Sequence, residues 1–123
     1  MILVDTSIWI DHFRAADPQL ADLLTRNEVL THPAVIGEIA LGSVAARAEV
    51  LRHLKNLPAA LVATAEEVMV FIDNHGLANS GVGYVDASLL ASAALTPGAA
   101  LWARDKKLHA AAVRCGVAAK VSS

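Results

Sequence analysis

Residues 1–14, MILVDTSIWIDHFR, decide the fold of this chain. The stretch opens on the apolar run of residues 1–4, which leads straight into Asp5, Thr6 and Ser7, residue types that favour the start of a helix. We therefore expect a buried strand that feeds directly into a helix. A strand that is apolar throughout is typical of a parallel sheet covered by helices.

The same order of short apolar run and helix continues along the chain. Further buried strands are expected over residues 29–30, 60–62, 99–102 and 117–121. Helices are expected from Pro18 and over residues 34–41, 46–54 and 84–95. Another helix is expected to begin at a Thr64/Glu67 capping box and to end at His75. The last expected helix runs from Asp105 to Gly116, with Leu108, Ala112 and Val113 on its apolar face. Because strands and helices alternate, the sequence predicts an α/β fold with a central parallel sheet, in a single domain over residues 1–123.

Composition excludes several classes of protein. The 123 residues carry 10 Lys+Arg against 12 Asp+Glu, so the net charge of −2 excludes a globally basic nucleic-acid binder but not a local basic patch. The single Cys115 excludes a disulfide framework and CxxC-type metal sites. The most apolar stretch, residues 81–103, is interrupted by a turn at residues 96–98, which leaves a helix too short to span a bilayer. We therefore expect a cytoplasmic protein with no membrane segment.

Three acidic residues stand alone in apolar segments. Asp5, Glu38 and Asp86 have no other formal charge near them in the sequence, and burying an unpaired carboxylate costs several kcal/mol. Asp5 follows the first expected strand and Asp105 follows a later one, and open parallel sheets bind ligands at such strand ends. Glu38 and Asp86 lie near the starts of helices on the same edge. We therefore expect four carboxylates to converge on one crevice.

A divalent cation would relieve the repulsion among these carboxylates. Two like charges about 4 Å apart repel by roughly 4 kcal/mol at an effective dielectric constant near 20, and the three apolar segments contain no Lys or Arg. All-oxygen ligation favours Mg²⁺ or Mn²⁺ over zinc, and such ions serve phosphoester chemistry. The basic neighbours of Asp105, which are Arg104, Lys106 and Lys107, suit a polyanionic backbone. Arg14 is a further candidate for RNA contact, with an ordinary solvated helix face as the alternative.

Four segments of the chain together carry a family resemblance. They are ILVDTSIWID at residues 2–11, VIGEIALG at 35–42, YVDASLLA at 84–91 and LWARDKKL at 101–108. In their order and spacing they resemble the PIN-domain ribonucleases, and among these the VapC toxins of VapBC toxin–antitoxin pairs. The resemblance runs essentially from end to end and implies a PIN-like three-layer α/β/α sandwich.

The resemblance also implies an activity and a set of site residues. It implies a Mg²⁺- or Mn²⁺-dependent endoribonuclease, the toxin of a type II toxin–antitoxin system, which hydrolyses RNA phosphodiesters with a metal-activated water. Asp5, Glu38 and Asp86 match the metal-binding catalytic acids, and Asp105 matches the fourth acid of the pocket. Thr6 matches a polar position where a hydroxyl orients the first acid or a metal-bound water. The implied partners are a VapB-type antitoxin, an RNA substrate and a second copy of the chain in a homodimer.

One position departs from the family pattern. Ala103 stands where the family commonly carries Thr or Ser, so the alternative function is a catalytically weak PIN-like module that mainly binds an antitoxin or RNA. Simpler structural roles also exist: Asp5 could serve only as a helix cap, and Asp86 could only favour the start of its helix. Asp11 and Asp17 are expected to be solvated surface acids.

A receiver domain or a phosphohydrolase shares an acidic edge of a parallel sheet, but neither fits the first segment. The phosphohydrolase pattern DxDxT needs a second acid at position 7, where Ser7 stands. A receiver needs paired acids after the first strand, and Asp5–Thr6 provides one.

Overall fold

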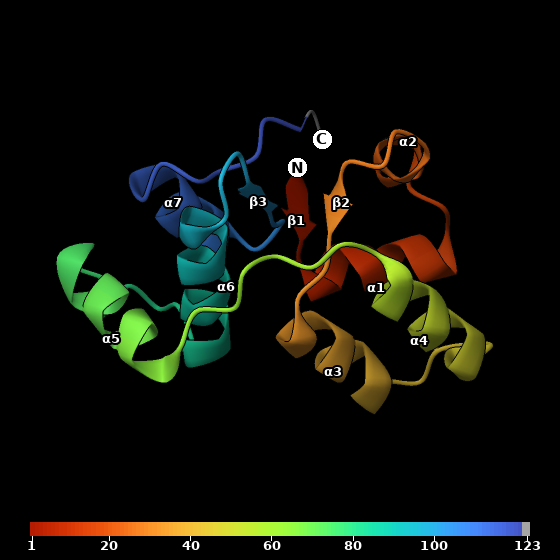
Figure 1. The fold of residues 1–123 in the computed structure, drawn as a ribbon, viewed down its shortest axis with the longest axis horizontal. Helices are drawn as coiled ribbons and strands as arrows, with labels where there is room; N and C mark the ends of the chain where they lie inside the picture. Colours follow the sequence, from red (N-terminus) through yellow and green to blue (C-terminus); the bar gives the residue numbers. More distant parts are fainter. Residues whose placement is uncertain (122–123) are drawn as a thin grey trace.

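The structure, a computed structural model, describes residues 1–121. A parallel sheet lies at its centre and has the strand order β2-β1-β3 (Figure 1). The strands are β1 (Ile2–Val4), β2 (Val29–Leu30) and β3 (Ala100–Trp102). In the central strand Leu3 and Val4 are fully buried, as the unbroken apolar run predicts.

The strand predicted over residues 60–62 is wrong in extent. Only a single bridge forms there, between Thr31 and Ala59 at the outer side of β2. Beyond it, the N–H of Leu61 donates to Thr96 Oγ1 at 2.9 Å instead of to a strand. The segment after Ala60 is thus tied to the end of α6 rather than continued as a strand.

The strand predicted over residues 117–121 is also reduced to one bridge, between Leu101 and Ala118. Two hydrogen bonds hold it, from Leu101 N–H to the carbonyl of Val117 at 2.7 Å and from Ala119 N–H to the carbonyl of Leu101 at 2.9 Å. The two bridges therefore extend the parallel sheet by one position on each side.

The predicted helices are confirmed, with bounds that shift by a few residues. They are α1 (Thr6–Arg14), α2 (Pro18–Thr25), α3 (Pro33–Leu41), α4 (Arg47–Asn56), α5 (Ala65–Asn74), α6 (Tyr84–Leu95) and α7 (Lys106–Arg114). Helix α1 packs against α3, and α3 packs against α4 (Figure 1). Helix α5 packs against α6, and α6 in turn contacts β3. A parallel sheet flanked by helices confirms the predicted α/β class.

Local signals in the sequence explain where these helices begin. Asp17 caps α2 by accepting the N–H groups of Gln19 and Leu20, with Pro18 in the first turn. The predicted capping box of α5 is confirmed, because the side chain of Thr64 accepts the N–H of Glu67 while the Glu67 carboxylate accepts the N–H of Thr64.

Helix α6 has more buried residues than any other helix of the described chain. Leu89, Leu90 and Ser92 have no exposed surface, which explains why its sequence is apolar all round rather than on one stripe. By contrast Val113 on α7, predicted to face the core, is 58% exposed and belongs to the solvent side of that helix. Within the described residues no helix is both long and apolar enough to cross a bilayer.

Candidate active site at the carboxyl edge of the sheet

Two of the four acids that the sequence singles out directly follow strands of the sheet, and the other two lie in helices. Asp5 comes directly after β1 at the N-cap of α1, and Asp105 comes after β3 at the N-cap of α7. Because β1 and β3 are parallel, both lie at the same edge, where the N–H of Asp5 donates to the carbonyl of Trp102 at 3.0 Å. Glu38 lies in α3, after β2, and Asp86 lies in the first turn of α6.

Asp5 is buried but does not serve as a helix cap. Its residue is 8% exposed, and its side chain makes no capping hydrogen bond to α1. One carboxylate oxygen instead accepts the hydroxyl of Ser7 at 3.1 Å. Burial, and to a lesser degree the charge of Glu38, raises the pKa of Asp5, although the Ser7 hydroxyl and the amides of the first turn oppose this in part. The simpler explanation of Asp5 as a cap therefore fails.

Thr6 orients a different acid from the one expected. Its hydroxyl donates to Glu38 Oε1 at 2.8 Å, across 32 positions of sequence, rather than to Asp5. The hydroxyl that holds Asp5 comes from Ser7, which the sequence reasoning missed as a site residue. Consecutive hydroxyl residues in the first turn of α1 thus support two different acids, and the Thr-Ser pair after Asp5 was the available signal.

Asp86 carries an uncompensated charge. Burial is the largest effect on it, followed by the charges of Asp5, Glu38 and Asp105, and together they raise the pKa of Asp86 to about 6. Within the described part of the chain its carboxylate has no hydrogen-bond donor or cation as a partner. The four acids therefore share one electrostatic environment.

Asp105 is the acid with a clear structural role. One carboxylate oxygen accepts the N–H of Leu108 at 2.9 Å and so caps α7. This contact fixes the side chain at the start of the helix while it still contributes to the raised pKa of Asp86.

The chemistry of these residues fits a hard divalent cation. Over residues 1–121 no three His, Cys, Asp or Glu side chains form a ready-made ligand group. The donors are nevertheless all oxygens, and the repulsion recorded at Asp86 is what a cation among them would relieve. The residues present therefore suit Mg²⁺ or Mn²⁺ better than zinc.

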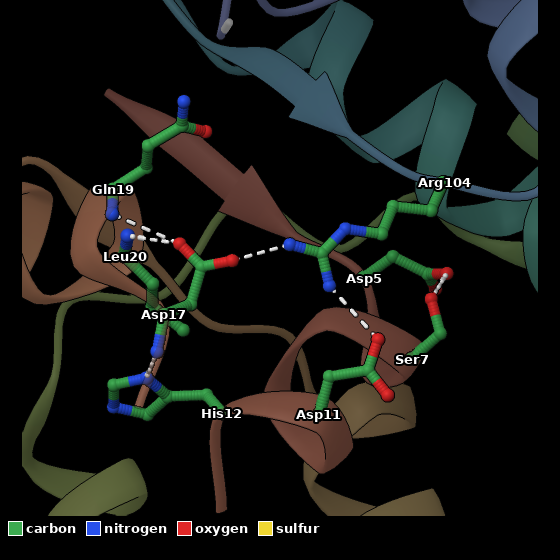
Figure 2. Close-up of polar contacts among 8 residues, drawn as sticks. All are labelled: Asp5, Ser7, Asp11, His12, Asp17, Gln19, Leu20 and Arg104. Atoms are coloured by element: carbon green, nitrogen blue, oxygen red, sulfur yellow. Dashed lines mark hydrogen bonds and ion pairs between the residues drawn. The ribbon is translucent and has the colours of Figure 1, made fainter. Parts of the chain in front are cut away.

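Arg104, a candidate RNA contact, is already engaged within the protein. Its guanidinium donates to Asp11 and Asp17, as Figure 2 shows, and lies 5.6 Å from the centre of the Trp102 ring. The expectation of a solvated surface acid is wrong for Asp17, which binds Arg104 and has a side chain only 15% exposed. Asp11 is at the surface as expected, with a side chain 53% exposed, but it also binds Arg104. The Asp17-Pro18 pair in the sequence predicts that Asp17 caps α2, but nothing local in the sequence predicts its ion pair with Arg104 or that of Asp11.

The other predicted basic residues are free to meet a ligand. Arg14, Lys106 and Lys107 are exposed and make no ion pair with any residue that the structure describes. The stem of Lys107 crosses Gly81, where φ is +85° and an added Cβ would lie 2.7 Å from Lys107 Cδ. Lys107 therefore lies against the loop that precedes α6 and Asp86.

Comparison with known proteins identifies the class of this chain. The family model described as the PIN domain matches residues 2–114, and the chain belongs to the PIN-domain family. Within that family it is a VapC-type ribonuclease toxin. It is 52% identical over 118 residues, 96% of this chain, to Ribonuclease VapC32 of Mycobacterium tuberculosis in strains CDC 1551 / Oshkosh and ATCC 25618 / H37Rv, and the match covers 95% of each relative.

These findings confirm the resemblance that the four sequence segments carry. Membership of the VapC group implies, in general, a VapB antitoxin as partner and RNA as substrate. PIN-domain ribonucleases are also generally dependent on divalent metal ions.

Proposed function

We propose that the chain is an endoribonuclease toxin that hydrolyses RNA phosphodiester bonds at the carboxyl edge of its sheet, with Mg²⁺ or Mn²⁺ as cofactor. The observation that carries this proposal is the placement of Asp5, Glu38 and Asp105 so close to Asp86 that, beside burial, their three charges raise its pKa. Carboxylates gathered so closely that the charges of three raise the pKa of Asp86 destabilise the fold unless a ligand uses them.

Asp5, Glu38 and Asp86 would hold the metal ion, with Asp105 at the side of the pocket. When bound, the ion supplies charge neutralisation at the phosphate and lowers the pKa of a nearby water. The protein residues do the rest of the positioning. The Thr6 hydroxyl keeps the Glu38 carboxylate in one orientation, and the Ser7 hydroxyl does the same for Asp5.

The RNA backbone would lie along the cations at the start of α7. Lys106 and Lys107 are exposed beside Asp105, and Arg14 lies at the end of α1. Phosphate contacts from such residues bind without sequence preference and weaken as salt rises. Hydrolysis by water in line with the leaving oxygen would give a 5′-phosphate and a 3′-hydroxyl.

We propose that a VapB-type antitoxin inhibits the chain by placing an arginine among the four carboxylates, since a guanidinium offsets their charge as a cation would. We also propose that the chain acts in the cytoplasm as a homodimer. Exposed apolar side chains such as Leu61, Val62 and Val70 support association with a second copy.

A cleavage assay on mixed cellular RNA tests the proposed activity. Purified, antitoxin-free protein is incubated with Mg²⁺, Mn²⁺ or EDTA, beside Asp5→Asn and the control Asp73→Asn, which changes an exposed acid on α5. We expect metal-dependent cuts from the wild type and the control and none from Asp5→Asn. Cuts that persist in EDTA or in Asp5→Asn would contradict the proposed site.

A catalytically weak module that mainly binds antitoxin or RNA is the second candidate, and Ala103 favours it. Its side chain is buried next to Trp102 and supplies no hydroxyl near Asp105. If this function is correct, the wild type cuts RNA poorly and Ala103→Thr cuts it faster. Equal rates for the two proteins would remove the reason for this alternative.

A further inference from the structure

We propose that Arg104 is a positioning residue that holds Asp105 toward the acidic pocket by binding Asp11 and Asp17 on the neighbouring helices. This inference rests on the proposed function, because it assigns a role in metal binding to a side chain that is not one of the four acids.

The guanidinium of Arg104 has three attachments. Nη1 donates to Asp11 Oδ2 at 2.8 Å and Nη2 donates to Asp17 Oδ2 (Figure 2). The group also lies 5.6 Å from the Trp102 ring centre. A planar guanidinium that meets two carboxylates and an aromatic face loses most of its rotational freedom. It is therefore a suitable anchor for the backbone that carries it.

The two acids are themselves held in place by α1 and α2. Asp17 uses its other oxygen to accept the N–H groups of Gln19 at 2.9 Å and Leu20 at 3.1 Å, and its own N–H donates to His12 Nδ1 at 2.9 Å (Figure 2). Although burial opposes ionisation, the hydrogen bonds from Leu20 and Arg104 lower the pKa of Asp17, so this carboxylate is charged. Asp11 projects from α1 itself.

The geometry of the chain transmits this anchoring to Asp105. Arg104 directly precedes Asp105, whose backbone is extended with φ −60° and ψ 128°. In extended backbone, successive side chains point in opposite directions. A side chain drawn toward Asp11 and Asp17 at position 104 therefore leaves position 105 to point the other way, and the Asp105 charge lies close enough to Asp86 to raise the pKa of that acid.

Arg26 provides a matched control elsewhere in the fold. It also pairs with two acids, Asp22 at 3.0 Å and Glu28 at 3.6 Å. It lies at the opposite, amino-terminal edge of the sheet, where the N–H of Ile2 donates to the carbonyl of Glu28. Removal of Arg26 breaks a similar pair of ionic contacts without affecting the four acids.

The test measures Mn²⁺ binding to RNA-free protein by electron paramagnetic resonance of the free ion. We expect Arg104→Ala to weaken binding by about tenfold, as loss of a side chain that orients a metal ligand does. We expect Arg104→Lys to lose less and Arg26→Ala to bind like the wild type. In an Asp105→Asn background, Arg104→Ala should have no further effect, because its influence passes through Asp105.

Two results would overturn the inference. One is wild-type Mn²⁺ affinity in Arg104→Ala; the other is an equal loss with and without Asp105→Asn. Weaker RNA binding in EDTA with Mn²⁺ affinity unchanged would instead assign Arg104 to RNA contact.

If Arg104→Ala does not fold, Asp11→Asn removes one attachment without touching the α2 cap, and it should weaken Mn²⁺ binding more than Asp22→Asn does. A wild type that neither binds Mn²⁺ nor cuts RNA would refute the proposed function itself.

Discussion

At the scale of the residue, the four acids differ in the hydrogen-bond donor that each carboxylate has. Asp5 has Ser7, Glu38 has Thr6, and Asp105 has the N–H of Leu108, whereas Asp86 has no such support among the described residues. Asp86 is consequently the place where electrostatic cost accumulates.

Asp86→Asn should stabilise the metal-free protein. The pKa of Asp86 is raised to about 6 from 3.8, so its unfavourable effect is absent in acid and develops as pH rises through that range. Because the residue is only half-buried, we expect a gain of about 1–2 kcal/mol at pH 7, seen as a melting temperature several degrees higher.

Thermal melts from pH 4 to pH 8 in EDTA check this prediction. The excess stability of Asp86→Asn over wild type should grow between pH 4 and pH 6 and then level off, while Asp73→Asn follows the wild type. A mutant less stable than wild type at pH 7 would contradict the electrostatic explanation.

Thr6→Ala should weaken metal binding while Thr6→Ser preserves it. The alanine removes the hydroxyl that donates to Glu38 Oε1 at 2.8 Å, and loss of such an orienting group lowers metal affinity by about tenfold. Mn²⁺ titration measures the effect. Thr25→Ala is the control, since that hydroxyl bonds only the carbonyl of Ala21 within α2; equal losses in both variants would argue against a specific role for Thr6.

At the scale of the element, α3 depends on a buried histidine at its start. His32 Nδ1 accepts the N–H of Ala34 at 3.0 Å, so its Nε2 carries the proton and donates to Ser92 Oγ at 3.0 Å. The same Ser92 oxygen accepts the N–H of Ala63 at 3.1 Å. One imidazole therefore ties the helix that carries Glu38 to α6 and to the segment before α5.

Acid should weaken this tie. Burial lowers the pKa of His32, so the folded state resists protonation and stability from this group falls as pH drops below about 6.5. Protonation would also place a hydrogen on Nδ1, where the N–H of Ala34 now binds.

Chemical denaturation of wild type and His32→Asn at pH 7.5 and pH 5.5 measures this effect. Asparagine is a good helix cap that does not titrate, so the variant should be less stable at pH 7.5 by about 1–3 kcal/mol and should lose less on acidification. His53→Asn on the exposed face of α4 is the control. A wild type that loses no more stability on acidification than His32→Asn does would contradict the argument.

At the scale of the whole molecule, the acidic edge borders the apolar core. Apolar residues such as Leu3, Ile8, Leu89 and Leu101 form one buried cluster, and Asp5 is buried directly after the central strand. Because burial of the apolar cluster drives folding, we expect a separation of core and site: the fold forms without a metal ion, and the acids make it less stable without one.

Metal should accordingly raise stability without changing the fold. A ligand at about 100 times its dissociation constant adds about 2.7 kcal/mol to the free energy of unfolding. We expect far-UV circular dichroism to be the same in EDTA and in Mg²⁺, and the melting temperature to rise with Mg²⁺ in the wild type and not in Asp5→Asn. A chain that is unfolded in EDTA would refute this separation of core and site.

Much of this molecule was predictable from its sequence because the signals are local. An apolar run followed by Asp5 and two hydroxyl residues predicts β1 and α1, and the Thr64/Glu67 pair predicts the start of α5. Caps and hydrophobic patterns act over a few residues, so they survive without knowledge of the fold. The isolation of Asp5, Glu38 and Asp86 in apolar segments singles out the same acids in the same way.

Only the tertiary structure decided how those parts meet. The Thr6–Glu38 hydrogen bond joins positions 32 apart, and Arg104 reaches Asp11 and Asp17 across 93 and 87 positions. Both predicted edge strands are reduced to single bridges, and beyond one of them the N–H of Leu61 is bound by the side chain of Thr96. Such contacts depend on the direction of each side chain once the parallel sheet has formed, and no local pattern encodes that direction. The sequence by itself thus determined the elements and the acids, and the packing of the sheet determined which neighbour holds each one.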